Sequence, residues 1–454
     1  MTDITEADGS ARLGGGGASV ASTGGAEGKP GPAAIGPDEF ADVDFFTDPS
    51  LIPDPYPYFD SLRRRCPVLT DGPGGTVVIT GYPEALSAYK DPAFSSCNAV
   101  VGPFAPMPFT ATGDDVRDLI AEHRDQIPMA EHVVTMDGDD HTRTRGLLSR
   151  LITPKRLSEN EEFMWRLADQ QLDSFVAKGS CEFMSDYAKP FSMLVIADLL
   201  GVPESDHQEF RAVLADQLVG ELDSELAHNP LVWLDDKFTE YITERREQPR
   251  GDVLTELAEA RYPDGSEPAV DEVVKLATFL FAAGQETTTK LLSAAMRVLG
   301  ERPDVQDAIR ADRRRIPVFL EETLRLESPV KSHFRFAAQT TAVGECPVAA
   351  GTTIMLLPGA SNRDPEKFAD PGEFRMDRPN VREHIAFGRG AHSCPGAPLA
   401  RAEGRISMNR ILDRMADIRI DETRHGCAEE RHYTYDPTFI MRGLSDLYLT
   451  FTPV

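Results

Sequence analysis

Residues 269–300 predict one long helix that is apolar on nearly all of its faces. A helix without a polar face has to be buried on every side, so the rest of the fold must enclose it. The pattern is mostly helical from about 114 to 330 and changes to short strands and proline-rich coil from about 333 to 378. The sequence therefore predicts a mainly α fold with minor β parts, that is, an α+β protein.

The start of the chain differs in composition from everything that follows. Residues 1–38 are rich in Gly, Ala and Ser and poor in large apolar groups, so we expect a disordered tail. No second linker follows, so residues 39–454 are expected to form a single large helix-rich domain. No apolar run reaches the roughly 18 residues that span a bilayer, and the N-terminus lacks the features of a signal peptide. We therefore expect no membrane partner.

Charge and cysteine content exclude other classes of protein. The formal net charge is -27, which makes a nucleic acid an unsuitable partner. The chain has six cysteines, and no two of them are closely spaced. This spacing argues against a disulfide framework or a zinc ribbon and favours a reducing cytoplasm.

One cysteine, Cys394, lies in the glycine-rich stretch FGRGAHSCPG, residues 387–396. The sequence behind it predicts an amphipathic helix, whose N-terminal amides at Gly396 and Ala397 would favour a thiolate and lower the pKa of Cys394. The preceding glycines would let the backbone pass close to a flat, bulky group. The alternatives are a buried structural cysteine or a cysteine nucleophile, although no flanking residues of a cysteine-protease type accompany Cys394.

The long helix carries a second unusual stretch, FAAGQETTTK. Gly284 costs about 1 kcal/mol relative to alanine in a helix interior, and the β-branched threonines after it can bond to the preceding turn. We therefore expect the helix to open most readily here. Glu286 beside Thr287 in such a turn could hold water and pass protons inward. The alternative is an ordinary buried helix with back-bonded threonines and a partly solvated Glu286.

The cysteine loop resembles the haem-binding signature of the cytochrome P450 haem-thiolate monooxygenases, Phe-Gly-x-Gly-x-His-x-Cys-x-Gly. The APLAR sequence after it is similar to that of the soluble bacterial members. The segment from Ala283 to Thr287 resembles the oxygen-activation motif of the family, with Glu286 where Asp is common. The resemblance covers roughly residues 45–454 and implies the cytochrome P450 fold. It also implies that Cys394 is the metal ligand of haem b, and that Thr287 and Glu286 are catalytic, supporting bound O2 and gating proton delivery.

The resemblance assigns further residues to the cofactor. His141 and Arg145, one helical turn apart, are expected to meet the haem propionates together with Arg335 and His392, because carboxylates at the rim of an apolar slot need cationic or hydrogen-bonding partners. The complete cofactor-binding set is Cys394, His141, Arg145, Arg335, His392, Phe387, Gly388 and Ala283. A structural role, in a buried polar cluster, is expected for Glu322, Arg325 and Arg378.

The resemblance implies insertion of one oxygen atom of O2 into a hydrophobic small molecule such as a terpenoid, steroid or fatty acid. The pocket walls are expected to come from four mostly apolar segments: Val100–Phe109, residues 276–287, Val330–Phe334 and Phe439–Met441. The alternatives are a haem-thiolate enzyme that uses peroxide directly and a non-enzymatic haem sensor. The intact Glu286–Thr287 pair argues against the first, and the lack of a visible output domain argues against the second.

Only residues 395–454 follow Cys394, so we expect no flavin or iron–sulfur module there. Electrons are expected to come from NAD(P)H through a separate ferredoxin reductase and ferredoxin, with a flavodoxin as a further option. Clusters of basic residues on an acidic chain suggest a docking face for an acidic carrier. These residues are Arg389, Arg401, Arg405, Arg410, Arg143, Arg150, Lys155 and Arg156. The protein is expected to act as a monomer in the cytoplasm.

Overall fold

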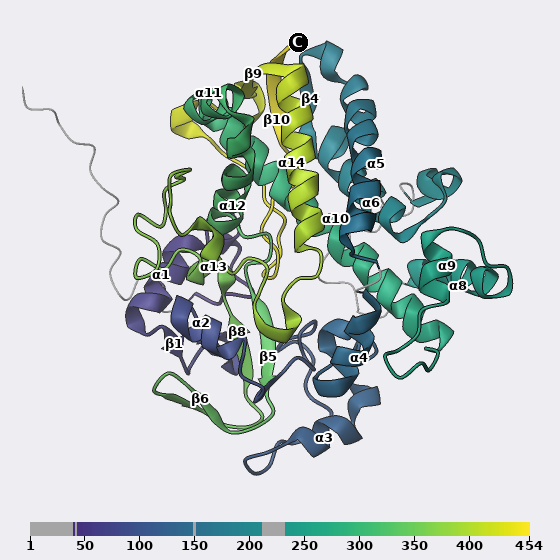
Figure 1. The fold of residues 1–454 in the computed structure, drawn as a ribbon. Coiled ribbons are helices and arrows are strands. Elements are labelled where there is room, and N and C mark those ends of the chain that lie inside the picture. The colour runs from purple at the N-terminus through teal and green to yellow at the C-terminus, as the bar shows by residue number, and fades with distance from the viewer. Residues whose placement is uncertain (1–39, 41–42, 149–150, 211–231) are drawn as a thin grey trace, which may run out of the picture.

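The structure is a computed structural model that describes residues 40, 43–148, 151–210 and 232–454. The tail expected at residues 1–38 lies outside these ranges. The molecule has a helix-rich side and a smaller side built around a sheet, which lies at the lower left of Figure 1. Within the described ranges, no helix is long and apolar enough to cross a membrane.

Most elements of the described chain are helices, as predicted. They are α1 Tyr56–Arg65, α2 Tyr82–Ala88, α3 Arg117–Glu122, α4 Gly138–Leu148, α5 Pro154–Asp173, α6 Lys189–Leu200, α8 Val232–Glu247, α9 Val253–Ala258, α10 Val270–Glu301, α11 Pro303–Ala311, α12 Ile316–Leu326, α13 Pro358–Ser361, α14 Ala397–Arg414 and α15 Glu422–His425. Local signals set several of these ends. For example, α5 begins where the Thr153 side chain accepts the Arg156 amide and Pro154 occupies the first helical position.

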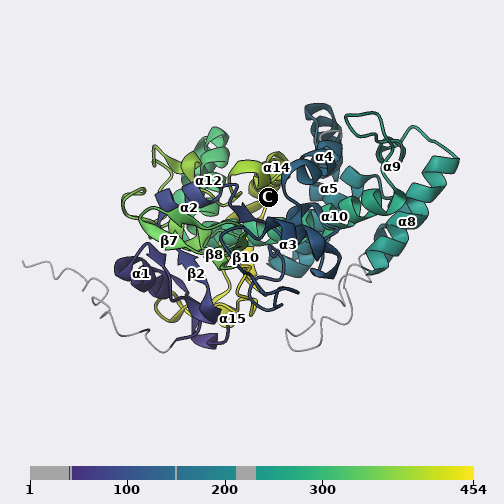
Figure 2. The same ribbon diagram turned by 90° about the horizontal axis from the view of Figure 1, so that it is seen from below.

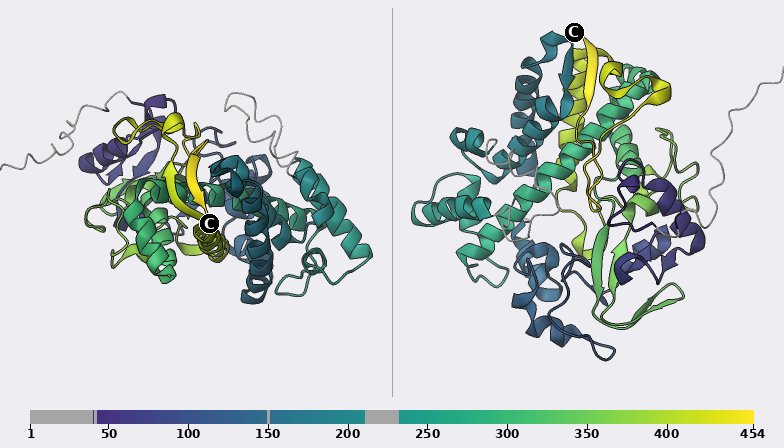
Figure 3. Two further views of the ribbon diagram at one scale, coloured as in Figure 1. Left: turned by 90° about the horizontal axis from the view of Figure 1, so that it is seen from above. Right: turned by 180° about the vertical axis from the view of Figure 1, so that it is seen from behind.

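The helix α10 is the long buried helix that the sequence predicts. It runs diagonally through the molecule, as the view from behind in Figure 3 shows, and packs against α6, α8, α12 and α14. The expected opening at Gly284 is absent from the structure, because α10 continues as an α-helix through this turn. The Thr287 hydroxyl donates to the Ala283 carbonyl at 2.9 Å. Thr289 likewise donates to Gln285 at 3.0 Å, so both of these threonines are back-bonded.

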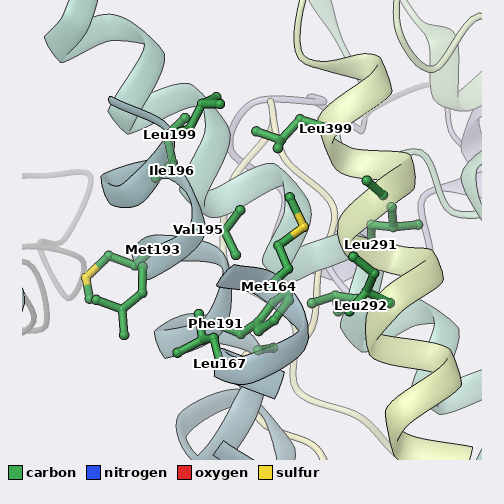
Figure 4. Close-up of a cluster of buried hydrophobic side chains, with 14 of the residues drawn as sticks. Met164, Leu167, Phe191, Met193, Val195, Ile196, Leu199, Leu291, Leu292 and Leu399 are labelled. Atoms are coloured by element: carbon green, nitrogen blue, oxygen red, sulfur yellow. The ribbon is translucent and has the colours of Figure 1, made fainter. Parts of the chain in front are cut away.

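The main core lies where α5, α6, α10 and α14 meet (Figure 4). It contains Met164 and Leu167 of α5, Phe191 and Val195 of α6, and Leu292 of α10. Buried residues lie on all faces of α6 as well as on α10. Burial of so much apolar surface is the main stabilising contribution to this half of the fold.

The larger sheet has the strand order β1-β2-β8-β5-β3, in which β2 and β8 are parallel and the other pairs are antiparallel. Figure 2 shows it with α1 at one end of the molecule and α8 and α9 at the other. The strands β4, β10 and β9 form a second sheet, and β6 pairs with β7. The bounds are β1 Val68–Leu69, β2 Val77–Ile79, β3 Phe94–Ser95, β4 Ser180–Glu182, β5 His333–Ala337, β6 Thr341–Val343, β7 Cys346–Val348, β8 Thr353–Leu356, β9 Met415–Ile420 and β10 Tyr448–Pro453.

The last twenty residues do not form one continuous hairpin. A bridge between Tyr435 and Leu444 closes a loop, and Met441 in that loop pairs with Val330. The strand β10 pairs instead with β9 and β4. The 436–445 loop therefore lies beside the start of the 330–334 segment, which is far from it in the sequence.

The polar cluster expected around Glu322 is present and buried. Glu322 accepts from Arg325 at 2.7 and 2.8 Å and from Arg378 at 3.2 Å, and all three side chains are almost fully enclosed. Arg325 also donates to backbone carbonyls at Asn362 and Pro371. The cluster therefore ties α12 to the coil that leads to the cysteine loop.

Candidate functional site

The cysteine loop is held by its own backbone. The Cys394 amide donates to the Phe387 carbonyl at 2.8 Å. Gly388 and Gly390 have φ values of 64° and 74°, which residues with side chains rarely adopt. At Gly390 a Cβ atom would also overlap the Tyr89 carbonyl oxygen. This glycine therefore makes room for a neighbouring backbone, a requirement that the sequence analysis missed.

The Cys394 sulfur accepts hydrogen bonds from the backbone amides of Gly396 and Ala397, as expected. The Cys394 side chain is accessible. It nevertheless lies low among surrounding protein atoms, so loss of water is the largest influence on its pKa. Burial raises the pKa of Cys394, although the two amides and the guanidinium groups of Arg145 and Arg401 act in the opposite direction. The amides of the loop therefore act on the pKa of Cys394 in the expected direction, but burial outweighs them. Coordination of a metal would supply the missing stabilisation, because a coordinated thiol loses its proton.

Four residues that the sequence assigns to the cofactor gather beside the cysteine loop. The rings of His141 and His392 have centroids 4.0 Å apart. Arg145 donates to the Ser393 carbonyl, next to Cys394. The pKa of His141 is lowered to about 4 by burial, by His392 and by the positive charges of Arg145 and Arg335. Arg335 belongs to β5, where side chains alternate between the two faces, so it lies on the face opposite the buried Phe334.

These residues carry more positive charge and donor capacity than their protein neighbours use. Nε2 of His141 is buried and has no hydrogen-bond partner among the described residues. Among the described residues, neither Arg145 nor Arg335 forms an ion pair with a carboxylate, and both donate hydrogen bonds to backbone carbonyls. His392 has one acidic neighbour, Asp137, at 3.8 Å. A group with two carboxylates, such as haem, fits this surplus, and the accessible Cys394 sulfur suits its iron.

The Ala283–Thr287 turn interrupts the burial of α10. Ala283 is exposed and Thr287 is half-buried, whereas most of the helix around them is enclosed. Glu286 is an ion-pair partner of Lys290 at 3.1 Å, and Lys290 also pairs with Asp436 at 2.5 Å. The sequence analysis missed Lys290, although its spacing of four residues from Glu286 is a signal for a helical ion pair.

A second acid near this turn was also missed. Glu403 of α14 is buried and accepts a hydrogen bond from the side chain of Thr288, which follows Thr287. Its Oε2 has no partner among the described residues. Burial raises the pKa of Glu403 to about 8, against the smaller opposing effect of Thr288. The signal in the sequence is helical spacing, since Glu403 shares a face with the apolar Leu399 and Ile406.

Replacing Glu403 by glutamine is expected to stabilise the protein more at pH 8 than at pH 5. The carboxyl group has a pKa of about 8 in the folded protein instead of 4.5, so the folded state binds its proton more tightly than the unfolded state does. The free energy of unfolding of the wild type should therefore fall by up to roughly 5 kcal/mol as the pH rises from below 4.5 to above about 8. Urea denaturation of Glu403→Gln at both pH values checks this, with the exposed Glu429→Gln as control. An equal effect of Glu403→Gln at the two pH values would contradict the assignment.

Apolar segments expected to line a substrate pocket meet in the structure. The Phe104 ring lies 4.5 Å from that of Phe439, and Phe439 lies 6.4 Å from Phe334. The bridge between Val330 and Met441 joins the same two segments. The aromatic cluster of Phe104, Phe334 and Phe439 thus combines three parts of the chain, and Phe104 remains 48% exposed.

The basic residues around α14 are largely neutralised by acids. Arg401 pairs with Glu321 at 2.6 Å and Arg405 with Glu161 at 2.7 Å. These four side chains border a surface groove of about 450 Å³. Arg410 pairs with Asp169. The expected basic cluster is therefore a mixed-charge surface.

The basic residues expected around α4 and α5 also contact acidic or aromatic side chains. Arg156 pairs with Glu256 at 2.8 Å, and Arg143 stacks over the Tyr262 ring at 3.7 Å. Lys155, which is exposed, has Glu159 at 3.7 Å. Arg150 lies outside the described residues.

Comparison with known proteins agrees with the fold and the motifs. A model of the cytochrome P450 family matches residues 223–416. Cytochrome P450 144 of Mycobacterium tuberculosis (strain ATCC 25618 / H37Rv) is 33% identical over 386 residues, 83% of this chain and 86% of that protein. The cytochrome P450 monooxygenase PikC of Streptomyces venezuelae is 32% identical over 401 residues, 87% of this chain and 90% of that protein.

A solved structure gives a further match. The substrate-free form of Mycobacterium marinum cytochrome P450 CYP150A6 is 62% identical, with a TM-score of 0.86, and the match covers 91% of this chain and 100% of that chain. The expected mainly α fold with minor β parts is thereby confirmed, and so is the resemblance from which it came. The chain belongs to the cytochrome P450 family, the haem-dependent monooxygenases that use O2.

Proposed function

We propose that this chain binds haem b through Cys394 and inserts one oxygen atom of O2 into a hydrophobic small molecule. Electrons come from NAD(P)H through ferredoxin reductase and ferredoxin. When bound, the haem supplies the activation of dioxygen that attack on a C–H bond requires. The observation that carries the proposal is that Arg145 and Arg335, beside an accessible cysteine, have no carboxylate partner among the described residues.

The residues of the cysteine loop act by binding and orientation. The Gly396 and Ala397 amides stabilise negative charge on the Cys394 sulfur. Arg145 and Arg335, with His141 and His392, would bind the two propionates and hold the cofactor beside the loop. Phe387 and Gly388 keep the loop in a shape that leaves the sulfur accessible, and the small side chain of Ala283 would leave space for the cofactor.

Thr287 and Glu286 act on water and protons. The Thr287 hydroxyl donates to the Ala283 carbonyl and can still accept a hydrogen bond, at an accessible point of a mostly buried helix. Glu286 has a side chain that is 37% exposed, so it can exchange protons with bulk water and pass them toward Thr287. Together they would deliver protons while the enclosed helix excludes other water.

The aromatic cluster supports an apolar substrate. Phe104, Phe334 and Phe439 form an apolar cluster without side-chain hydrogen-bonding groups, so we expect a terpenoid, a steroid or a fatty acid. Screening such compounds for a low-spin to high-spin shift of the Soret band tests this directly. A panel of polar compounds that shifts the spectrum, with no response to apolar ones, would contradict the substrate class.

The electron carrier would dock near α14. The groove bordered by Arg401 and Arg405 lies on the helix that follows Cys394, and an acidic ferredoxin could compete there for arginines now paired with Glu321 and Glu161. All six cysteines are free thiols, as a reducing cytoplasm would keep them. Product formation with NADPH, ferredoxin and its reductase, compared with peroxide alone, tests the electron source. Equal turnover with peroxide alone would favour the peroxide-using alternative.

Replacing Thr287 by alanine is expected to divert electrons from product to hydrogen peroxide. The hydroxyl that would hold a proton beside the bound oxygen is lost, so product formed per NAD(P)H should fall by about tenfold or more, with oxygen consumption maintained. Thr289→Ala is the matched control, because the Thr289 hydroxyl is buried and bonds to Gln285 within the helix. Unchanged product per NAD(P)H in Thr287→Ala would refute the role of Thr287.

A further inference from the structure

Lys290 is a buried cation on the helix that carries Glu286 and Thr287. Its side chain is 2% exposed, whereas its two partners, Glu286 and Asp436, are 37% and 35% exposed. The ammonium group therefore lies inside the protein while both carboxylates reach the surface. Burying a charged group is costly unless it is paired, so this position requires at least one of the two acids.

The surroundings are shaped to receive the Lys290 side chain. A Cβ atom at Gly443 would overlap Cγ of Lys290 and contact its neighbouring carbons. The Gly443 carbonyl also accepts a hydrogen bond from the Asp436 amide at 3.1 Å. The Ser445 hydroxyl donates to the Asp436 carboxylate at 2.8 Å. The 436–445 loop thus supplies the space for the lysine stem and a fixed carboxylate for its ammonium group.

A second buried lysine, Lys331, lies close enough to Lys290 to be affected by its charge. Lys331 is buried, and its pKa is lowered to about 7 by burial and by the positive charges of Arg442 and Lys290. No carboxylate pairs with Lys331 in the described part of the chain. Whenever Lys331 is protonated, its charge therefore disfavours a shift of the Lys290 ammonium toward it.

We propose that Lys290 is a positioning residue for Glu286, and that Asp436 and Gly443 hold Lys290 in place. This inference rests on the proposed proton-delivery role of Glu286. With Lys290 present, the Glu286 carboxylate is fixed at one point between bulk water and the Thr287 turn. Without it, a half-exposed glutamate samples several rotamers, and most of them carry the carboxylate into solvent.

The arrangement also links proton delivery to the substrate region. Asp436 belongs to the loop that carries Phe439 of the aromatic cluster and Met441, the bridge partner of Val330. A ligand that moves this loop would move Asp436 and, through Lys290, Glu286. Lys290 is therefore the connection through which substrate contact and proton supply can be coordinated.

Replacing Lys290 by methionine tests the proposal in the haem-loaded enzyme. Both carboxylates that lose their partner are half-exposed, so the variant is expected to fold. Product formed per NAD(P)H should fall by about tenfold and the solvent deuterium isotope effect on turnover should rise. Lys290→Arg should restore most of the coupling. Lys275→Met is the matched control, because Lys275 is a second lysine of α10 that pairs with two acids, Asp235 at 2.7 Å and Glu131 at 3.7 Å.

A second variant leaves every charge in place. Gly443→Ala should displace the Lys290 stem and reproduce the loss of coupling, although Lys290, Glu286 and Asp436 are all still present. A double-mutant cycle on urea unfolding, with Lys290→Met and Glu286→Gln, provides a readout that does not depend on turnover. It should show that the two side chains are coupled by a factor of about two to ten in the unfolding constant.

The outcomes separate this inference from the proposed function. If Glu286→Gln uncouples turnover but Lys290→Met and Gly443→Ala do not, the role of Lys290 is refuted and that of Glu286 stands. If Glu286→Gln leaves coupling intact, proton delivery through Glu286 is itself wrong, and the inference fails with it. Additive effects in the double-mutant cycle would also overturn the proposal.

Discussion

Replacing Cys394 by histidine is expected to reduce monooxygenase turnover to the level of the reaction without enzyme. The backbone amides of Gly396 and Ala397 both donate hydrogen bonds to the Cys394 sulfur, which suits it to carry negative charge. A thiolate ligand donates electron density to iron and favours O–O cleavage, which a neutral imidazole does not do. Product formation with a complete electron-transfer chain is the measurement, and haem content of the variant is determined in parallel.

A second cysteine provides the control for this experiment. Cys427 is exposed and distant in sequence from the loop, so Cys427→Ser should retain wild-type turnover. Turnover in Cys394→His comparable to that of the wild type would show that the sulfur does not perform the role assigned to it.

Replacing Glu322 by glutamine is expected to lower the free energy of unfolding by about 3–5 kcal/mol. The substitution leaves Arg325 and Arg378 buried without a counter-charge, since both side chains are at most 2% exposed and Glu322 is their shared carboxylate. Folded proteins are stable by only about 5–15 kcal/mol, so a large part of the total is removed. Chemical denaturation of the haem-loaded proteins measures the change.

The matched comparison for Glu322→Gln is an ion pair on the surface. Asp304 pairs with Arg302 at 2.7 Å, but both side chains are largely exposed. Asp304→Asn should therefore change the free energy of unfolding by less than about 1 kcal/mol. A similarly small change in Glu322→Gln would mean that the buried cluster does not need its negative charge to hold the loop region.

The sequence predicts the features that depend on local pattern. The apolar run at 269–300 predicts α10 to within a residue or two, because a helix apolar on all sides has no other stable environment. The glycine spacing around Cys394 predicts a loop before a helix, and Gly388 and Gly390 do adopt left-handed backbone angles there. The family resemblance, not local pattern, assigns His141 and His392 to one task, and their ring centroids lie 4.0 Å apart.

The features that the sequence does not predict depend on contacts between distant segments. Asp436 meets Lys290 across 146 positions, and no local pattern indicates that pairing. Burial decides the direction of the pKa shifts of Cys394 and Glu403, and burial is a property of the whole fold. Arg401 and Arg405 read as free positive charges in the sequence, yet each pairs with an acid from another helix. Local propensity likewise suggested an opening at Gly284, but α10 continues as an α-helix through this turn, with the Thr287 and Thr289 hydroxyls bonded to carbonyls of the preceding turn.

The absorption spectrum of the ferrous carbonyl form of the haem-loaded wild type tests the central claim most directly. The account predicts the red-shifted Soret band that a cysteine thiolate ligand produces, and loss of that band in Cys394→His. A wild-type band typical of nitrogen ligation, or failure of the purified protein to take up haem at all, would contradict the account.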